Sequence, residues 1–211
     1  MKILAHRGYW NSDIPNNSME ALQTALDRGF GFESDIRDYD GRLVISHNIA
    51  DSLSPFADAI FEKMHQHSDQ YCFAINIKAD GLKELLTKLL YQYDIKNYFT
   101  FDMSVPQMIE FREMGIRYFT RESEVETVPV MYEDAAGVWI DGFFDTNWIT
   151  EDLLRKHIAN GKEVCIVSPE LHKREYIDFW KRLYSFDLDF SKVMLCTDLP
   201  DEAKLFFGGI V

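Results

Sequence analysis

A chain of 211 residues with 46% hydrophobic and 27% charged residues is long enough for one core and too hydrophobic to be intrinsically disordered. Its formal net charge of −13 argues against a surface that binds nucleic-acid phosphates or anionic lipid. We therefore predict one domain over residues 1–211. Because the sequence has no signal-peptide pattern and no 18-residue apolar stretch, we expect it in the cytoplasm without stable membrane association.

Short apolar runs alternate along the chain with longer amphipathic segments, a pattern typical of repeated βα units. Continuous apolar cores indicate parallel strands that are buried on both faces. Eight such units without a linker favour a closed (β/α)8 TIM barrel over an open sheet. The predicted strands are Ile3–His6, Phe30–Ile36, Cys72–Ile77, Tyr98–Phe101, Arg117–Thr120, Val138–Ile140, Val164–Val167 and Val193–Cys196. Three cysteines lie in these runs and are expected to be buried and unpaired.

The first predicted helix begins after Ser18, which can cap its first turn, and ends before Gly29. Further helices are predicted at Leu82–Tyr91, Pro106–Glu113, Thr150–Ala159, Arg174–Tyr184 and Asp201–Phe207, with the weakest helical pattern at Pro129–Ala135. The Asp40-Gly41 turn, followed by Arg42 to His47, predicts a small hairpin after the second strand.

Polar residues gather where the predicted strands end, which is the face of a βα barrel that carries the active site. Glu33 and Asp35 are two residues apart on one strand, so their carboxylates point to the same face. Two convergent carboxylates, with the amide oxygen of Asn76 from the next strand, predict a site for Mg²⁺ or Ca²⁺. Lys78 lies on the same face as Asn76 and would bind a phosphoryl group beside the metal.

Two histidines lie in the same region: His6 ends the first predicted strand, and His47 ends the predicted hairpin. Imidazole gains or loses a proton near neutral pH, so one histidine could act as base and the other as acid toward an alcohol leaving group. Arg7, next to His6, has the planar guanidinium that suits phosphate oxygens. These residues together predict acid/base catalysis on a phosphodiester.

Four segments resemble motifs of the glycerophosphodiester phosphodiesterases in order and spacing. They are Ala5-His6-Arg7-Gly8, Pro15-Asn16-Asn17-Ser18, Glu33-Ser34-Asp35 and Val44-Ile45-Ser46-His47-Asn48, and the resemblance continues through Lys78 to Thr197-Asp198-Leu199-Pro200. The resemblance implies a (β/α)8 barrel, His6 and His47 as the acid/base pair, and Glu33 and Asp35 as metal ligands. It also implies a role in lipid or glycan glycerol-phosphate metabolism.

The chain departs from the family motifs at three polar positions and on the seventh strand. Asn16 and Asn48 stand where the family usually has glutamate and aspartate, and Asn76 stands where it usually has the third carboxylate ligand. The seventh strand, which often carries a tryptophan, here reads Cys165-Ile166-Val167-Ser168. These changes indicate a divergent branch with a different substrate and a weaker metal site.

Arg121, after the fifth predicted strand, is our first candidate for an additional substrate-phosphate ligand, alongside Arg7 and Lys78. The predicted reaction is metal-dependent hydrolysis of a small-molecule glycerophosphodiester to an alcohol and a glycerol phosphate. Two alternatives stay open: a phospholipase C-like lyase that stops at a cyclic phosphate, and a catalytically silent barrel that only binds phosphodiesters. The sequence carries no sign of nucleic-acid binding and no signal of oligomeric state.

Overall fold

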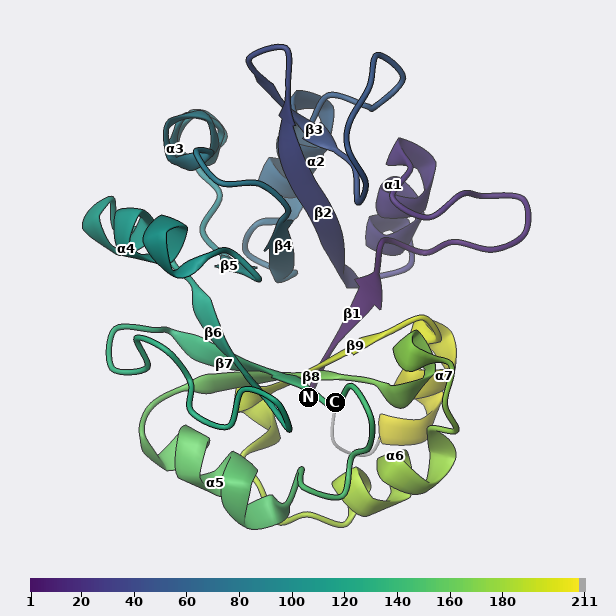
Figure 1. Cartoon of the computed structure of the whole chain (residues 1–211). Coiled ribbons are helices and arrows are strands. Elements are labelled where there is room, and N and C mark those ends of the chain that lie inside the picture. Colours follow the sequence, from purple (N-terminus) through teal and green to yellow (C-terminus); the bar gives the residue numbers. More distant parts are fainter. Residues whose placement is uncertain (209–211) are drawn as a thin grey trace. The chain divides into compact units, whose positions relative to one another are not determined.

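The computed structural model describes residues 1–208, and their contacts divide the chain into two compact units (Figure 1). The amino-terminal unit is Ala5–Tyr118. The carboxy-terminal unit is made of Met1–Leu4 and the chain from Phe119 onward. Every residue of the predicted catalytic and metal sites belongs to the amino-terminal unit, and Arg121 belongs to the carboxy-terminal one.

In the amino-terminal unit, strands and helices alternate as predicted. The elements are β1 (Lys2–His6, whose first residues belong to the other unit), α1 (Met19–Asp27), β2 (Gly31–Tyr39), β3 (Arg42–Ile45), α2 (Asp58–His67), β4 (Phe73–Ile77), α3 (Lys83–Gln92), β5 (Tyr98–Phe101) and α4 (Val105–Glu113). The strand order is β5-β4-β2-β1, and β2, β4 and β5 pair in parallel. Strand β3 pairs antiparallel with β2, with Ile36 opposite Ile45, which confirms the predicted hairpin at Asp40-Gly41.

Helix α1 packs on β2 and α2, and α3 contacts both α2 and α4, so the helices form a continuous layer along the strands (Figure 1). Ser18 caps α1 as predicted, because its Oγ accepts a 3.0 Å hydrogen bond from the amide of Ala21. Leu22, Phe61 and Phe73 are fully buried between the strands and this layer. Burial of such side chains supplies most of the stabilisation that holds the strand ends, and so the polar groups on them, in place.

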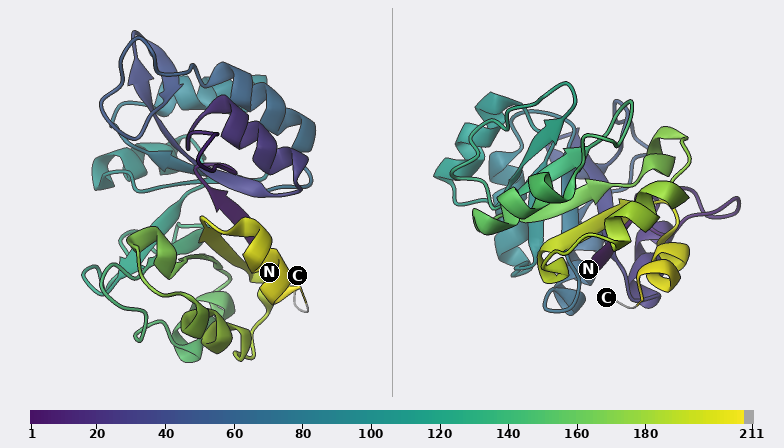
Figure 2. Two further views of the ribbon diagram at one scale, coloured as in Figure 1. Left: turned by 90° about the vertical axis from the view of Figure 1, so that its right-hand side faces the viewer. Right: turned by 90° about the horizontal axis from the view of Figure 1, so that it is seen from below.

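The carboxy-terminal unit contains four parallel strands in the order β9-β8-β7-β6. Its elements are β6 (Phe119–Ser123), β7 (Gly137–Asp141), α5 (Glu151–Ala159), β8 (Glu163–Val167), a 3₁₀ helix (Pro169–His172), α6 (Ile177–Tyr184), a second 3₁₀ helix (Phe190–Lys192), β9 (Val193–Thr197) and α7 (Pro200–Phe207). Helices α5 to α7, green to yellow in the two views of Figure 2, lie along one side of these strands. Trp180 of α6 is fully buried, and its indole N–H donates a 2.8 Å hydrogen bond to Ser168.

Two helical expectations differ from the structure. Helix α2 was not among the predicted helices, and Pro129–Ala135 forms turns in place of the weakly predicted helix. That segment is held by tertiary hydrogen bonds: Thr120 Oγ1 donates to the carbonyl of Val130 at 2.7 Å, and Lys162 Nζ donates to the carbonyl of Ala135 at 2.8 Å. These side-chain donors satisfy backbone carbonyls of the segment that would otherwise accept hydrogen bonds within a helix.

Cys72, Cys165 and Cys196 are buried and form no disulfide bond, as expected from their place in apolar strands. Over residues 1–208, no helix combines the length and the apolar character that a bilayer crossing requires.

Candidate active site

A tight turn after β1 brings Arg7 toward the carboxylates of β2. Arg7 and Gly8 both have positive φ, 56° and 84°, so the backbone reverses sharply at this point. A Cβ on Gly8 would lie 2.6 Å from the carbonyl carbon of Ala21, so only glycine allows the turn to pack against the start of α1. The turn directs the backbone N–H of Arg7 to Oε2 of Glu33, at 3.1 Å.

Asp35 is fully buried and is surrounded by positive charge and hydrogen-bond donors. Its Oδ2 lies 3.1 Å from Nε of Arg7 and accepts a 2.6 Å hydrogen bond from the side-chain amide of Asn17. Its Oδ1 lies 3.3 Å from Nζ of Lys78, which is also 3.6 Å from Oδ2 of Asp102. Two cations therefore offset the charge of Asp35 and are themselves fixed by it.

Glu33, on the same face of β2, is 1% exposed and has fewer partners than Asp35. Its Oε2 lies 3.8 Å from Nε2 of His6, whereas its Oε1 is buried without a hydrogen-bond partner among the described residues. The pKa of Glu33 is raised from 4.5 to about 7, first by burial and second by the Asp35 carboxylate, and these effects outweigh the lowering influence of His6, Arg7 and Lys78. The site thus holds a carboxylate that lacks a full complement of positive charge.

Asn76 on β4 is the parallel-strand partner of Asp35, and the side chain is nearly buried. Its Oδ1, like Oε1 of Glu33, has no hydrogen-bond partner among residues 1–208. A buried oxygen that accepts no hydrogen bond destabilises the folded protein unless a cation or a water molecule binds it. Mg²⁺ and Ca²⁺ are bound by carboxylate and amide oxygens. The donor set around Glu33, Asp35 and Asn76 therefore fits a hard divalent cation, although no three His, Cys, Asp or Glu side chains of the described chain form a metal-binding group.

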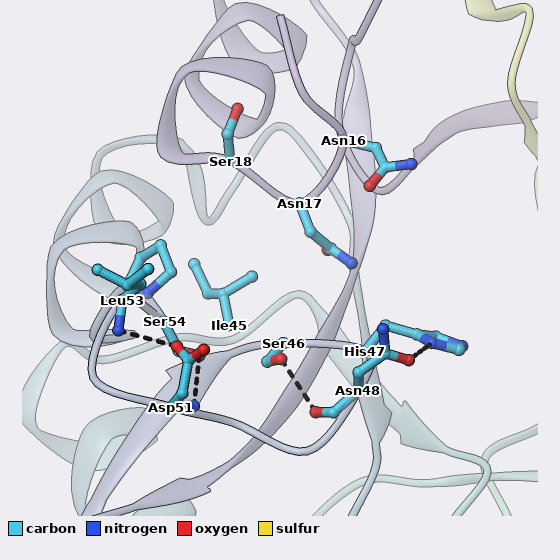
Figure 3. A pocket seen from close by; sticks show the side chains of 11 residues that line it. Asn16, Asn17, Ser18, Ile45, Ser46, His47, Asn48, Asp51, Leu53 and Ser54 are labelled. Atoms are coloured by element: carbon cyan, nitrogen blue, oxygen red, sulfur yellow. Dashed lines mark hydrogen bonds between the residues drawn. The ribbon is translucent and has the colours of Figure 1, made fainter.

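His47 is exposed and follows the end of β3. The backbone at this point is fixed by a 3.0 Å hydrogen bond from the amide of Ser46 to the carbonyl of Asp35. The ring is oriented by its neighbour, because Nδ1 of His47 lies 3.2 Å from Oδ1 of Asn48. His47 and Asn17 both line an open depression of about 380 Å³ (Figure 3), which adjoins the carboxylate that Asn17 binds.

Six of the predicted site residues lie together in one network. The seventh, His47, is positioned by the backbone hydrogen bond of its neighbour Ser46. His6, Arg7, Glu33, Asp35 and Lys78 are linked by the ion pairs and hydrogen bonds described above, and Asn76 is the strand partner of Asp35. His47 adjoins the network through Ser46. Arg121 lies in the carboxy-terminal unit, where its guanidinium pairs with Glu126 and lies 5.7 Å from the ring centroid of Phe143.

Sequence reasoning assigned no role to Asn17, which organises the site. Its Nδ2 donates to Asp35, and its Oδ1 accepts from Ser34 Oγ at 3.1 Å and from the amide of Asp35 at 3.3 Å. The available signal was its place between a proline and the helix-capping Ser18. Asn17 has a positive φ of 55°, a conformation that asparagine tolerates better than most residues.

Several solved phosphodiesterases resemble this chain in structure. A glycerophosphodiester phosphodiesterase from Parabacteroides distasonis aligns with a TM-score of 0.76 over 100% of this chain and 98% of its own, at 15% identity. The enzyme from Thermotoga maritima aligns with a TM-score of 0.69 at 18% identity, over 98% and 96% of the two chains. The chain has the (β/α)8 barrel fold of these enzymes.

A phosphodiesterase from Oleispira antarctica, solved in complex with its product sn-glycerol-3-phosphate, aligns with a TM-score of 0.72 at 17% identity over 99% of this chain and 97% of its own. No family model matches the chain, and no curated protein sequence matches it. At these identities the structural likeness concerns the fold.

Proposed function

We propose that the chain is a phosphoric diester hydrolase that cleaves a small-molecule glycerophosphodiester to an alcohol and a glycerol phosphate. One observation carries this proposal: His6, Arg7, Glu33, Asp35 and Lys78 form a single network of charged contacts. The fold of solved glycerophosphodiester phosphodiesterases, one with glycerol phosphate bound, supports the same reaction class.

Arg7 and Lys78 are proposed to bind the phosphodiester, because each is held in place by Asp35 and each offers further N–H donors to phosphate oxygens. Arg121 is a further proposed phosphate ligand. Its guanidinium already pairs with Glu126, so phosphate would have to compete with that carboxylate.

His6 and His47 are proposed as the acid/base pair. One histidine removes a proton from the attacking water or neighbouring substrate hydroxyl, and the other protonates the departing alkoxide. Attack by the hydroxyl forms a cyclic phosphate, which the same pair then opens by activating water. Glu33, 3.8 Å from His6 Nε2, is close enough to stabilise the protonated ring. Asn48 orients His47 through its contact with Nδ1, leaving Nε2 for the substrate.

The proposed cofactor is Mg²⁺ or Ca²⁺, held by Glu33, Asp35 and Asn76. When bound, it would neutralise charge on the phosphodiester. Support comes from three buried oxygens that accept no hydrogen bond within residues 1–208, namely Oε1 of Glu33, Oδ1 of Asp35 and Oδ1 of Asn76. We also propose that the reaction takes place in the cytoplasm.

The test follows cleavage of glycerophosphodiesters by phosphorus NMR, with and without chelator. His6→Ala and His47→Ala should each lower turnover by about two to four orders of magnitude, whereas the exposed His65→Ala serves as the matched control. A glycerol phosphate product identifies a hydrolase, and an accumulating cyclic phosphate identifies a lyase. Full turnover in both His6→Ala and His47→Ala would refute the assignment.

A further inference from the structure

The depression beside His47 is a candidate subsite for part of the substrate. It lies within the amino-terminal unit, between the loop that precedes α1 and the segment that follows β3. Figure 3 shows the amides of Asn16 and Asn17 and the ring of His47 along one side, with Asp51, Leu53 and Ser54 opposite. Its volume of about 380 Å³ is at the small end of the range for ligand pockets.

The polar lining of this depression consists almost entirely of neutral groups. Asn16, Asn17, Ser46, Asn48 and Ser54 contribute amides and hydroxyls. Among the described residues that line it there is no lysine, arginine or aromatic ring other than His47, and Asp51 is the single carboxylate. Asp51 Oδ1 accepts a 2.9 Å hydrogen bond from the amide of Leu53, which fixes the carboxylate at the wall.

Two of these amides have hydrogen-bonding capacity to offer a ligand. The side chain of Asn16 makes no hydrogen bond within residues 1–208, and Asn48 uses its Oδ1 toward His47, which leaves its NH₂ group. Asn16 and Asn48 are also two of the three positions where this chain has an amide and the resembling family usually has a carboxylate, the third being Asn76. Both departures therefore remove negative charge from one depression.

This lining discriminates between the alcohols that a phosphodiester can carry. A quaternary ammonium group is recognised by several aromatic faces, and a second anionic group by lysine or arginine. Of these groups the lining offers only the single ring of His47. A polyol has several hydroxyls that both donate and accept, which matches amides, hydroxyls and one carboxylate. The apolar Ile45, Leu53 and Pro55 complete the wall and suit the C–H face of a sugar or cyclitol.

We propose that this depression binds the alcohol that leaves from the phosphate, and that this alcohol is an uncharged polyol such as glycerol, a cyclitol or a sugar. The inference rests on the proposed phosphodiesterase function and specifies its substrate class. His47 lines the depression, so in this proposal it is the histidine that protonates the departing polyol oxygen.

The first test compares kcat/KM for glycerophosphoglycerol and glycerophosphoinositol with kcat/KM for glycerophosphocholine and glycerophosphoethanolamine. We expect the polyol diesters to be preferred by at least about tenfold, which corresponds to about 1.4 kcal/mol. Asn16→Asp adds a carboxylate to the rim and should lower this preference by about threefold. Asn11→Asp, in an exposed loop outside the depression, is the matched control and should leave the preference unchanged.

A second variant tests the carboxylate without changing the turn around it. Asp51→Asn keeps the oxygen that accepts from Leu53, and should raise KM for the polyol diesters about fivefold or more with little change in kcat. Bis(p-nitrophenyl) phosphate, which has no hydroxyls, should be cleaved equally by Asp51→Asn and the unmodified protein. If Asp51→Asn lowers activity equally toward the polyol diesters and toward bis(p-nitrophenyl) phosphate, the proposed subsite is overturned, because the substitution then acts on the structure and not on polyol binding.

The outcomes separate this inference from the proposed function. Cleavage of all four glycerophosphodiesters with equal efficiency, or a preference for choline, would overturn the polyol subsite while the hydrolase stands. If none is cleaved, the proposed hydrolase fails, and calorimetric titration of the intact diesters then decides the subsite. Preferential binding of the polyol diesters that Asp51→Asn weakens would support it, and equal binding of all four would overturn it.

Discussion

The side-chain amide of Asn17 donates a 2.6 Å hydrogen bond to Oδ2 of Asp35. The opposite end of the same amide accepts from the backbone N–H of Asp35 at 3.3 Å. One amide group therefore fixes both the backbone and the carboxylate of Asp35. A hydrogen bond to a buried carboxylate is worth more than one between neutral groups.

Asn17→Asp should be strongly disruptive, because it replaces the donor by a second carboxylate facing buried Asp35. We expect kcat/KM to fall by about 10- to 100-fold and the free energy of unfolding to fall by about 2 kcal/mol. Urea unfolding and phosphodiester cleavage measure the two effects. Asn11→Asp is the control, because the Oδ1 of Asn11 only accepts, from the amides of Asp13 and Ile14. Equal behaviour of the two variants would contradict the role of Asn17.

Metal binding is expected to be weak in the free protein, because Asn76 is neutral and Asp35 already contacts two cations. Affinity for Mg²⁺ or Ca²⁺ should tighten when phosphate is present. Asn76→Glu should tighten metal binding in the free protein by about tenfold. Calorimetric titration of metal into both forms measures this, with the exposed Gln70→Glu as a control of equal charge. Identical affinities with and without phosphate would rule out the coupling.

Glu33 should make the stability of the metal-free protein depend on pH. Because burial raises its folded-state pKa from 4.5 to about 7, the folded protein keeps a proton that the unfolded chain loses between these values. The free energy of unfolding contributed by Glu33 therefore falls as pH rises through this interval. In chelator, Glu33→Gln should be more stable than the unmodified protein by about 1–3 kcal/mol near pH ~8, and no more stable near pH ~4.

Urea unfolding at the two pH values tests the effect of Glu33, and Glu62→Gln provides the exposed carboxylate control. Divalent metal should reverse the order at the higher pH, because only the carboxylate can bind it well. A Glu33→Gln variant that is equally stabilised at both pH values would contradict the raised pKa.

Gly8→Ala should destabilise the protein more than Gly81→Ala, although both glycines have nearly the same φ, 84° and 82°. An alanine at either position adopts an unfavourable backbone conformation that costs about 1–2 kcal/mol. Only at Gly8 does the new Cβ also meet backbone, 2.6 Å from the carbonyl carbon of Ala21, whereas nothing lies within 4 Å at Gly81. Thermal unfolding of the two variants measures the effect of the clash. Equal losses of stability would contradict the prediction, because they would mean that the backbone around Gly8 shifts to relieve the clash.

The strands and their polar ends could be predicted from sequence because buried parallel strands are continuous apolar runs. No bounds were predicted for helix α2. Ala57 at its N-cap position makes no side-chain cap hydrogen bond, but a missing cap is not the whole reason, because α3 and α6 also lack one and were predicted. The alternation of residues on β2 predicted that Glu33 and Asp35 share a face. It could not predict that Asp35 would be paired with Arg7 and Lys78 while Glu33 would keep an oxygen without a partner, because those contacts depend on tertiary distances.

Asp35 is the common partner of Arg7, Asn17 and Lys78. Substitutions at these three positions are therefore not independent events, since each changes the surroundings of the same carboxylate. Their energetic effects should be non-additive, and once Asp35 itself is replaced by asparagine a second change at Arg7 or Lys78 should cost far less than it does alone. Asp35, Arg7, Asn17 and Lys78 therefore constrain one another during evolution. A substitution at one of them is costly as long as the other three are unchanged.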